Sequence, residues 1–95
     1  MKVHLEFSGG LELLFGKKKQ LTLELDQETI GILPLIQHIR DHLLKERPEL
    51  FVVGNSVRPG ILVLINDCDW ELEGGTESIV RDGDKICFIS TLHGG

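Results

Sequence analysis

The sequence lacks the features of a membrane, secreted or nucleic-acid-binding protein. No segment approaches the roughly 20 consecutive apolar residues that a membrane-spanning helix requires, and the first six residues lack the apolar core of a signal peptide. Only two cysteines are present, Cys68 and Cys87, which is weak support for a disulfide and fits reduced thiols in the cytosol. We therefore expect a cytoplasmic protein without a membrane partner, and leave the nucleus open.

Positive charge is scarce. Ten Lys and Arg stand against fifteen Asp and Glu, which gives a formal net charge of −5. The stretch from Asp67 to Asp84 holds most of the imbalance, and the only basic run is Lys17-Lys18-Lys19. Because nucleic-acid binding requires cations along a groove or face, we expect no direct contact with nucleic acid. A basic partner protein fits this charge better.

Motifs for independent catalysis are also missing. His38 and His42 have the i, i+4 spacing of a zinc protease helix, but Ile39 stands where that motif carries its glutamate. We interpret the pair as part of a solvated helix face. Cys68 lies between two carboxylates, a setting that does not activate a thiol nucleophile. The glycine pairs lack the lysine of a phosphate-binding loop. We expect no catalytic residue, no metal site and no bound cofactor.

The hydrophobic pattern changes period along the chain and predicts both strands and a helix. The expected strands are Lys2–Phe7, Leu21–Leu25, Ile61–Ile65, Asp69–Leu72 and Lys85–Ser90, with the apolar segment Leu11–Phe15 joining the first two. An apolar stripe with a spacing of four and three residues begins at Ile32 and predicts a helix over Ile32–Glu46. Pro34 fits its first turn, and Pro48 prevents its continuation.

These elements predict an α+β fold. One amphipathic helix can cover one face of a mixed four- to five-stranded sheet. The first and last strands both look central, and their parallel pairing gives the β-grasp, or ubiquitin-like, roll. We expect a single domain over residues 1–95, monomeric, with a flexible Gly-Gly tail from about residue 91.

The tail carries the strongest functional signal. The sequence ends Leu92-His93-Gly94-Gly95, and its last two residues have no Cβ. Such a segment is slim enough to thread a narrow channel into a partner's active site, with Leu92, His93 and Gly94 giving access. The Gly95 carboxylate is then unhindered, but it becomes an acyl donor only after a partner activates it, typically as an acyl-adenylate.

Three blocks of sequence resemble the ubiquitin-related modifier family, the sulfur-carrying branch of the ubiquitin-like proteins. They are residues 44–51 (LKERPELF), 57–72 (VRPGILVLINDCDWEL) and 88–95 (FISTLHGG). The resemblance implies that an E1-like activating enzyme adenylates Gly95 with ATP. The rhodanese-like domain of that enzyme then converts it to a thiocarboxylate with sulfur from a donor. It further implies sulfur delivery to a tRNA thiolation enzyme, for 2-thiolation of wobble uridine, and conjugation to lysines of target proteins.

Two alternatives stay open at this point. Sulfur carriers for molybdopterin or thiamine synthesis share the expected fold and the Gly-Gly end, although the 57–72 block and the Leu-His-Gly-Gly ending favour the modifier family. A non-covalent ubiquitin-like interaction module would share the fold but would not need the Gly-Gly end.

A docking surface is expected on the sheet face that the helix leaves uncovered. By similarity to ubiquitin-like proteins, one set of strand residues is assigned to the core: Ile61, Val63, Ile65, Ile86 and Phe88. The opposite set then forms an exposed apolar patch that leads to the tail: Leu62, Leu64, Cys87 and Ile89. Contiguous apolar surface of this kind usually marks a partner site, and the acidic residues from Asp67 to Asp84 can orient the encounter.

Overall fold

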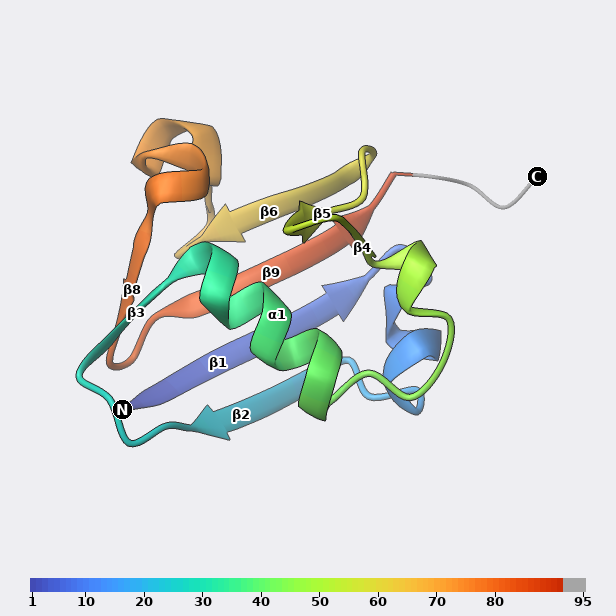
Figure 1. Ribbon diagram of the computed structural model, residues 1–95, viewed down its shortest axis with the longest axis horizontal. Helices are drawn as coiled ribbons and strands as arrows, with labels where there is room; N and C mark the ends of the chain where they lie inside the picture. The colour runs from blue at the N-terminus through green and yellow to red at the C-terminus, as the bar shows by residue number, and fades with distance from the viewer. Residues whose placement is uncertain (92–95) are drawn as a thin grey trace.

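The sheet is built around the first and last strands of the chain. A computed structural model describes residues 1–91. In it β1 (Lys2–Ser8) and β9 (Lys85–Ser90) lie side by side and run parallel, with Leu5 opposite Ile86 and Phe7 opposite Phe88 (Figure 1). The expected central parallel pair is therefore present, and residues 1–91 close into a roll around it.

Three further strands complete a mixed sheet in the order β2-β1-β9-β6-β7. They are β2 (Gln20–Glu24), β6 (Ile61–Ile65) and β7 (Cys68–Asp69), and each pairs antiparallel with its neighbour. The five-stranded sheet and its one main helix confirm the predicted α+β β-grasp class. The prediction of a strand over 69–72 was wrong: the Asp69 carboxylate accepts a hydrogen bond from the Glu71 N–H, at 2.9 Å, and caps a 3₁₀ turn over Trp70–Glu73 instead.

The helix α1 (Ile32–His42) crosses one face of the sheet (Figure 1). It begins as expected but ends four residues before the predicted Glu46. The N–H groups of Leu43 and Leu44 both donate to the carbonyl of Ile39, and the Lys45 N–H donates to the carbonyl of Leu14, 2.9 Å away. The chain therefore leaves the helix to pair with the segment between β1 and β2, which periodicity within the helix cannot reveal.

Short elements connect these parts. The remaining strands form two small antiparallel pairs, β3 (Thr29–Gly31) with β8 (Ile79–Arg81) and β4 (Val52–Val53) with β5 (Ser56–Val57). Four 3₁₀ helices complete the described residues: η1 (Leu11–Phe15), η2 (Pro48–Leu50), η3 (Trp70–Glu73) and η4 (Gly75–Glu77). The sequence predicted neither of these small pairs, because a strand of two or three residues is too short to show a hydrophobic periodicity.

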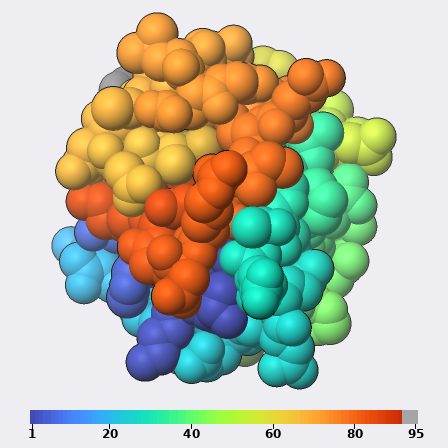
Figure 2. All heavy atoms as spheres, turned by 90° about the vertical axis from the view of Figure 1, so that its left-hand side faces the viewer, coloured from blue at the N-terminus to red at the C-terminus, as the bar shows by residue number. Residues whose placement is uncertain are grey.

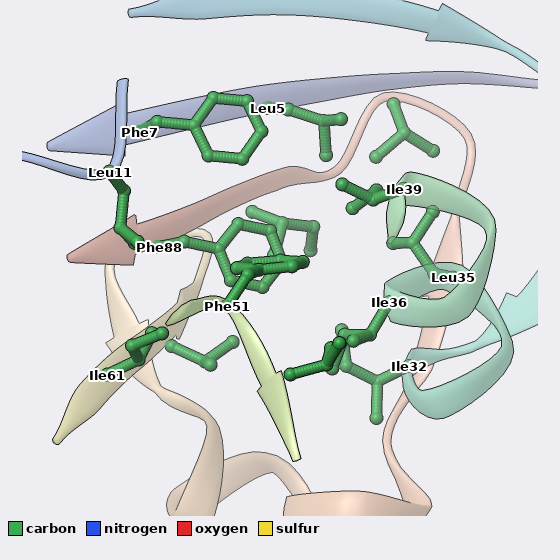
Figure 3. Close-up of a cluster of buried hydrophobic side chains, with 14 of the residues drawn as sticks. Leu5, Phe7, Leu11, Ile32, Leu35, Ile36, Ile39, Phe51, Ile61 and Phe88 are labelled. Atoms are coloured by element: carbon green, nitrogen blue, oxygen red, sulfur yellow. The ribbon is translucent and has the colours of Figure 1, made fainter. Parts of the chain in front are cut away.

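The core fills the space between the sheet and α1. Leu35, Ile36 and Ile39 of the helix point toward Leu5, Phe7 and Phe88 of the central strands (Figure 3). All four phenylalanines of the sequence meet there: Phe7 stacks on Phe15 with ring centroids 3.9 Å apart, and Phe51 packs edge-on against Phe88 at 5.3 Å. This packing fixes β9, and with it the point where the tail begins.

Candidate functional site

The described chain ends at a hydrogen-bonded corner of the sheet. Thr91 directly follows β9, and its N–H donates to the carbonyl oxygen of Gly60 at 2.9 Å. The Thr91 hydroxyl donates to the same oxygen. These bonds extend the β6–β9 ladder by one position beyond the Ile61–Ser90 pair. The predicted reactive residue Gly95 and the access residues Leu92, His93 and Gly94 lie outside the described residues.

Two glycines make this corner possible. Gly60 has φ +99°, a conformation that costs other residues free energy, and it turns the chain into β6. On the other side of β9, Gly9 has φ +70°, and a Cβ at this position would lie 2.2 Å from the Ser90 carbonyl oxygen. The backbone at the base of the tail is thus enclosed between Gly9 and Gly60. Nothing in the sequence distinguishes Gly9 from an ordinary turn glycine, so this role was missed.

The outer face of the sheet carries the predicted docking residues. In the register Leu62 lies opposite Ile89, and Leu64 lies opposite Cys87. Leu62, Leu64 and Ile89 are half-buried, whereas the inward set (Ile61, Val63, Ile65, Ile86 and Phe88) is at most 8% exposed. The inward assignment is therefore confirmed, and of the four residues assigned outward all but Cys87 are more exposed than the inward set. We call Leu62, Leu64 and Ile89 the outer-face patch; its role in docking stays a prediction.

Cys87 was wrongly expected to be an exposed member of this patch. It is only 6% exposed, and its Sγ donates a hydrogen bond to Oε2 of Glu6 at 3.2 Å. Burial, reinforced by the hydrogen bond and the negative charge of Glu6, raises the pKa of Cys87 to about 11. Lys85 opposes this shift. Cys87 therefore underlies the patch as a neutral, poorly nucleophilic thiol.

The other side chains considered for catalysis are dispersed. His38 and His42 lie on α1 with ring centroids 4.4 Å apart, and among residues 1–91 no group of three or more potential ligands could hold a metal ion. Cys68 is exposed and lines a depression of about 330 Å³ together with Glu73, Glu77 and Arg81. These side chains do not assemble a nucleophile with a base and an oxyanion site within the described chain.

The acidic stretch divides into two groups. Four of its acids hold the local structure. Asp67 pairs with the Lys85 ammonium at 2.8 Å, Asp69 caps η3, Asp82 accepts from the N–H of Lys2, and Asp84 accepts from Asn66 and Arg81. Glu71, Glu73 and Glu77 are exposed on η3 and η4, which project at the top of Figure 2. The carboxylates of this second group have no structural bond of this kind to any of residues 1–91, so they are the better placed to orient a partner.

Comparisons with known proteins decide the family. The model of the Urm1 (Ubiquitin related modifier) family matches residues 2–95. The chain belongs to the ubiquitin-related modifier family. It is 64% identical over 96 residues to the ubiquitin-related modifier 1 homolog of Dictyostelium discoideum, covering 100% of both chains. It is 61% identical over 100 residues to the homolog of Chlamydomonas reinhardtii, covering 100% of this chain and 99% of the relative.

A solved structure agrees with the fold. The solution structure of Urm1 from Trypanosoma brucei has a TM-score of 0.87 at 45% identity, and the match covers 99% of this chain and 95% of that chain. The protein is therefore a ubiquitin-like modifier and sulfur carrier rather than an enzyme. Members of this family bind no cofactor themselves, and membership of the family implies an E1-like partner. Among residues 1–91, no helix is both long and apolar enough to span a membrane.

Proposed function

We propose that the Gly95 carboxylate is the working group of this modifier. The activating enzyme adenylates it with ATP and releases pyrophosphate, which makes one carboxylate oxygen part of a leaving group. A persulfide of the rhodanese-like domain then attacks the acyl carbon and displaces AMP. A second thiol attacks the inner, enzyme-bound sulfur of the resulting acyl disulfide, so that the thiocarboxylate leaves on Gly95 and the two enzyme thiols are oxidised to a disulfide. The observation that carries this proposal is the match to the family model, which covers residues 2–95 and therefore includes Gly94 and Gly95.

The sulfur is delivered to a tRNA thiolation enzyme for 2-thiolation of wobble uridine, and the activated carrier is also conjugated to lysines of target proteins. The exposed carboxylates on η3 and η4 support a division of labour, because they would repel phosphates. The thiolation enzyme, rather than this chain, makes the contact with tRNA. We place this work in the cytoplasm and assign it to a monomer, one ubiquitin-like domain whose tail begins at about residue 91.

The outer-face patch is proposed to dock the activating enzyme. Leu62 and Ile89 lie at the end of β6 and β9 nearest Thr91, so a partner seated on them is close to the base of the tail (Figure 1). Glu71, Glu73 and Glu77 lie beyond the opposite end of β6. A partner that is apolar opposite the patch and basic opposite these carboxylates would be bound in one orientation.

The competing carrier functions are separated by a test in cells. Three cell lines, which lack respectively the endogenous modifier, the molybdopterin sulfur carrier and the thiazole sulfur carrier, are each complemented with this chain, and 2-thiouridine in tRNA, molybdopterin and thiazole are measured in the corresponding line. The proposal requires that thiouridine is restored and that molybdopterin and thiazole are unaffected. Restoration of molybdopterin or thiazole in its place would identify the alternative carrier class.

A further inference from the structure

The base of the tail is held more firmly than chain connectivity requires. Thr91 is exposed and contributes little to the core, yet its N–H and its hydroxyl both donate to the single carbonyl oxygen of Gly60. A residue that merely followed a strand would need only the first of these bonds. On the opposite side, Gly9 lies against Ser90 so closely that no larger residue fits without movement.

We propose that the Thr91–Gly60 pair is a positioning device for the tail. It fixes the point and the direction in which the chain leaves the sheet, so that Thr91 need not be ordered again when the tail enters the activating enzyme. This inference rests on the proposed function of Gly95. It makes Thr91 a positioning residue rather than a catalytic one, since it acts through the backbone that follows it.

Reach explains why such a device matters. A fully extended chain spans at most about 3.3–3.6 Å per residue, so four residues carry the Gly95 carboxylate no more than about 14 Å from Thr91. The activating enzyme's nucleotide site must therefore come within that distance of Thr91. A fixed starting point therefore aligns the tail whenever the body of the protein docks.

Loss of the pair should weaken binding rather than chemistry. If Thr91 is released, it must be ordered again on each encounter, and fixing the backbone of one further residue lowers the affinity by about 5- to 30-fold. Removal of the hydroxyl bond alone should cost about three- to tenfold. In either case the bound geometry at Gly95 is the same, so KM rises while kcat is unchanged.

Three substitutions of Thr91 test the proposal. Thr91→Ser keeps both donors, Thr91→Val keeps the shape and the N–H but removes the hydroxyl, and Thr91→Pro removes both. In steady-state adenylation by the activating enzyme, the KM of Thr91→Ser should equal the KM of the unsubstituted protein. The KM of Thr91→Val should be about three- to tenfold higher, and the KM of Thr91→Pro should be higher still. Thr29→Val, at an exposed threonine on β3, is the matched control and should leave KM unchanged.

Each outcome has a defined meaning. Equal KM values for Thr91→Val and Thr91→Ser overturn the positioning role, as does a fall in kcat at constant KM. Melting temperatures close to that of the unsubstituted protein are expected, because Thr91 is outside the core; if Thr91→Pro unfolds, the serine–valine comparison still decides. Absence of adenylation of the unsubstituted protein would instead refute the proposed function of Gly95, and this inference with it.

Discussion

The Sγ of Cys87 lies 3.2 Å from the Glu6 carboxylate, to which it donates a hydrogen bond across the parallel pair of strands. Burial, reinforced by this contact, raises the pKa of Cys87 and keeps a neutral thiol beneath the outer-face patch. A reactive thiol only four residues from Thr91 would compete for an activated acyl group, and burial together with the Glu6 contact suppresses that reactivity.

The two cysteines should therefore differ in alkylation rate. A thiol reacts as its thiolate, and the pKa of Cys87, raised to about 11, leaves little thiolate near neutral pH. Iodoacetamide under native conditions at about pH 8 should modify the exposed Cys68 first, as read by peptide mass spectrometry, and Glu6→Gln should speed modification of Cys87. Equal rates at both cysteines would contradict the buried hydrogen bond.

Substitution of Gly9 by alanine should destabilise the protein more than the same substitution at Gly54, a glycine with a similar backbone conformation. Gly9 and Gly54 have φ of +70° and +64°, but only at Gly9 does a Cβ meet backbone atoms. Both substitutions carry the cost of a left-handed residue, about 1 kcal/mol, and Gly9→Ala should cost about 1–3 kcal/mol more. Urea unfolding of the two variants measures the difference. Equal losses would mean that Ser90 can move aside freely.

Acid should weaken the fold through His38. Burial lowers the pKa of His38 below its usual value of 6.5, His42 lowers it further, and Asp41 opposes the shift. As the pH falls below the pKa that His38 has in the unfolded chain, the unfolded chain binds a proton before the folded protein does. Stability is therefore lost as the pH falls from the unfolded-state pKa to the folded-state pKa of His38. The change in Tm between about pH 7.5 and about pH 5.5 should shrink in His38→Gln.

The outer-face patch should be separable from the core. The double substitution Leu64→Ser with Ile89→Ser should weaken binding to the activating enzyme and cost little stability, because both side chains are only half-buried. Phe88→Ala, on the opposite face between Cys87 and Ile89, should destabilise by about 3–5 kcal/mol. Calorimetric binding and thermal melts distinguish the two effects. Unfolding of the double variant would show that the patch belongs to a core.

Sequence reasoning succeeded where a pattern was long enough to be periodic. Ile61–Ile65 and Lys85–Ser90 have the predicted bounds, and the inward side chains of both strands are buried. It failed where distant contacts decide. The helix stops at His42 because Lys45 pairs with Leu14, and Cys87 is covered by Glu6, which is 81 residues away. Gly9 and Gly60 are ordinary turn signals in sequence, and their role at Thr91 emerges only from the fold.

The central claim, that Gly95 carries the reacting carboxylate, is tested most directly by intact mass. The protein is incubated with its activating enzyme, ATP and a sulfur donor, beside a variant that lacks Gly95 and a Cys68→Ser variant. We expect the unsubstituted protein and Cys68→Ser to gain the mass difference between sulfur and oxygen, and the shortened chain to gain nothing while its Tm is unchanged. Loss of the mass gain in Cys68→Ser, or its persistence without Gly95, would contradict the account.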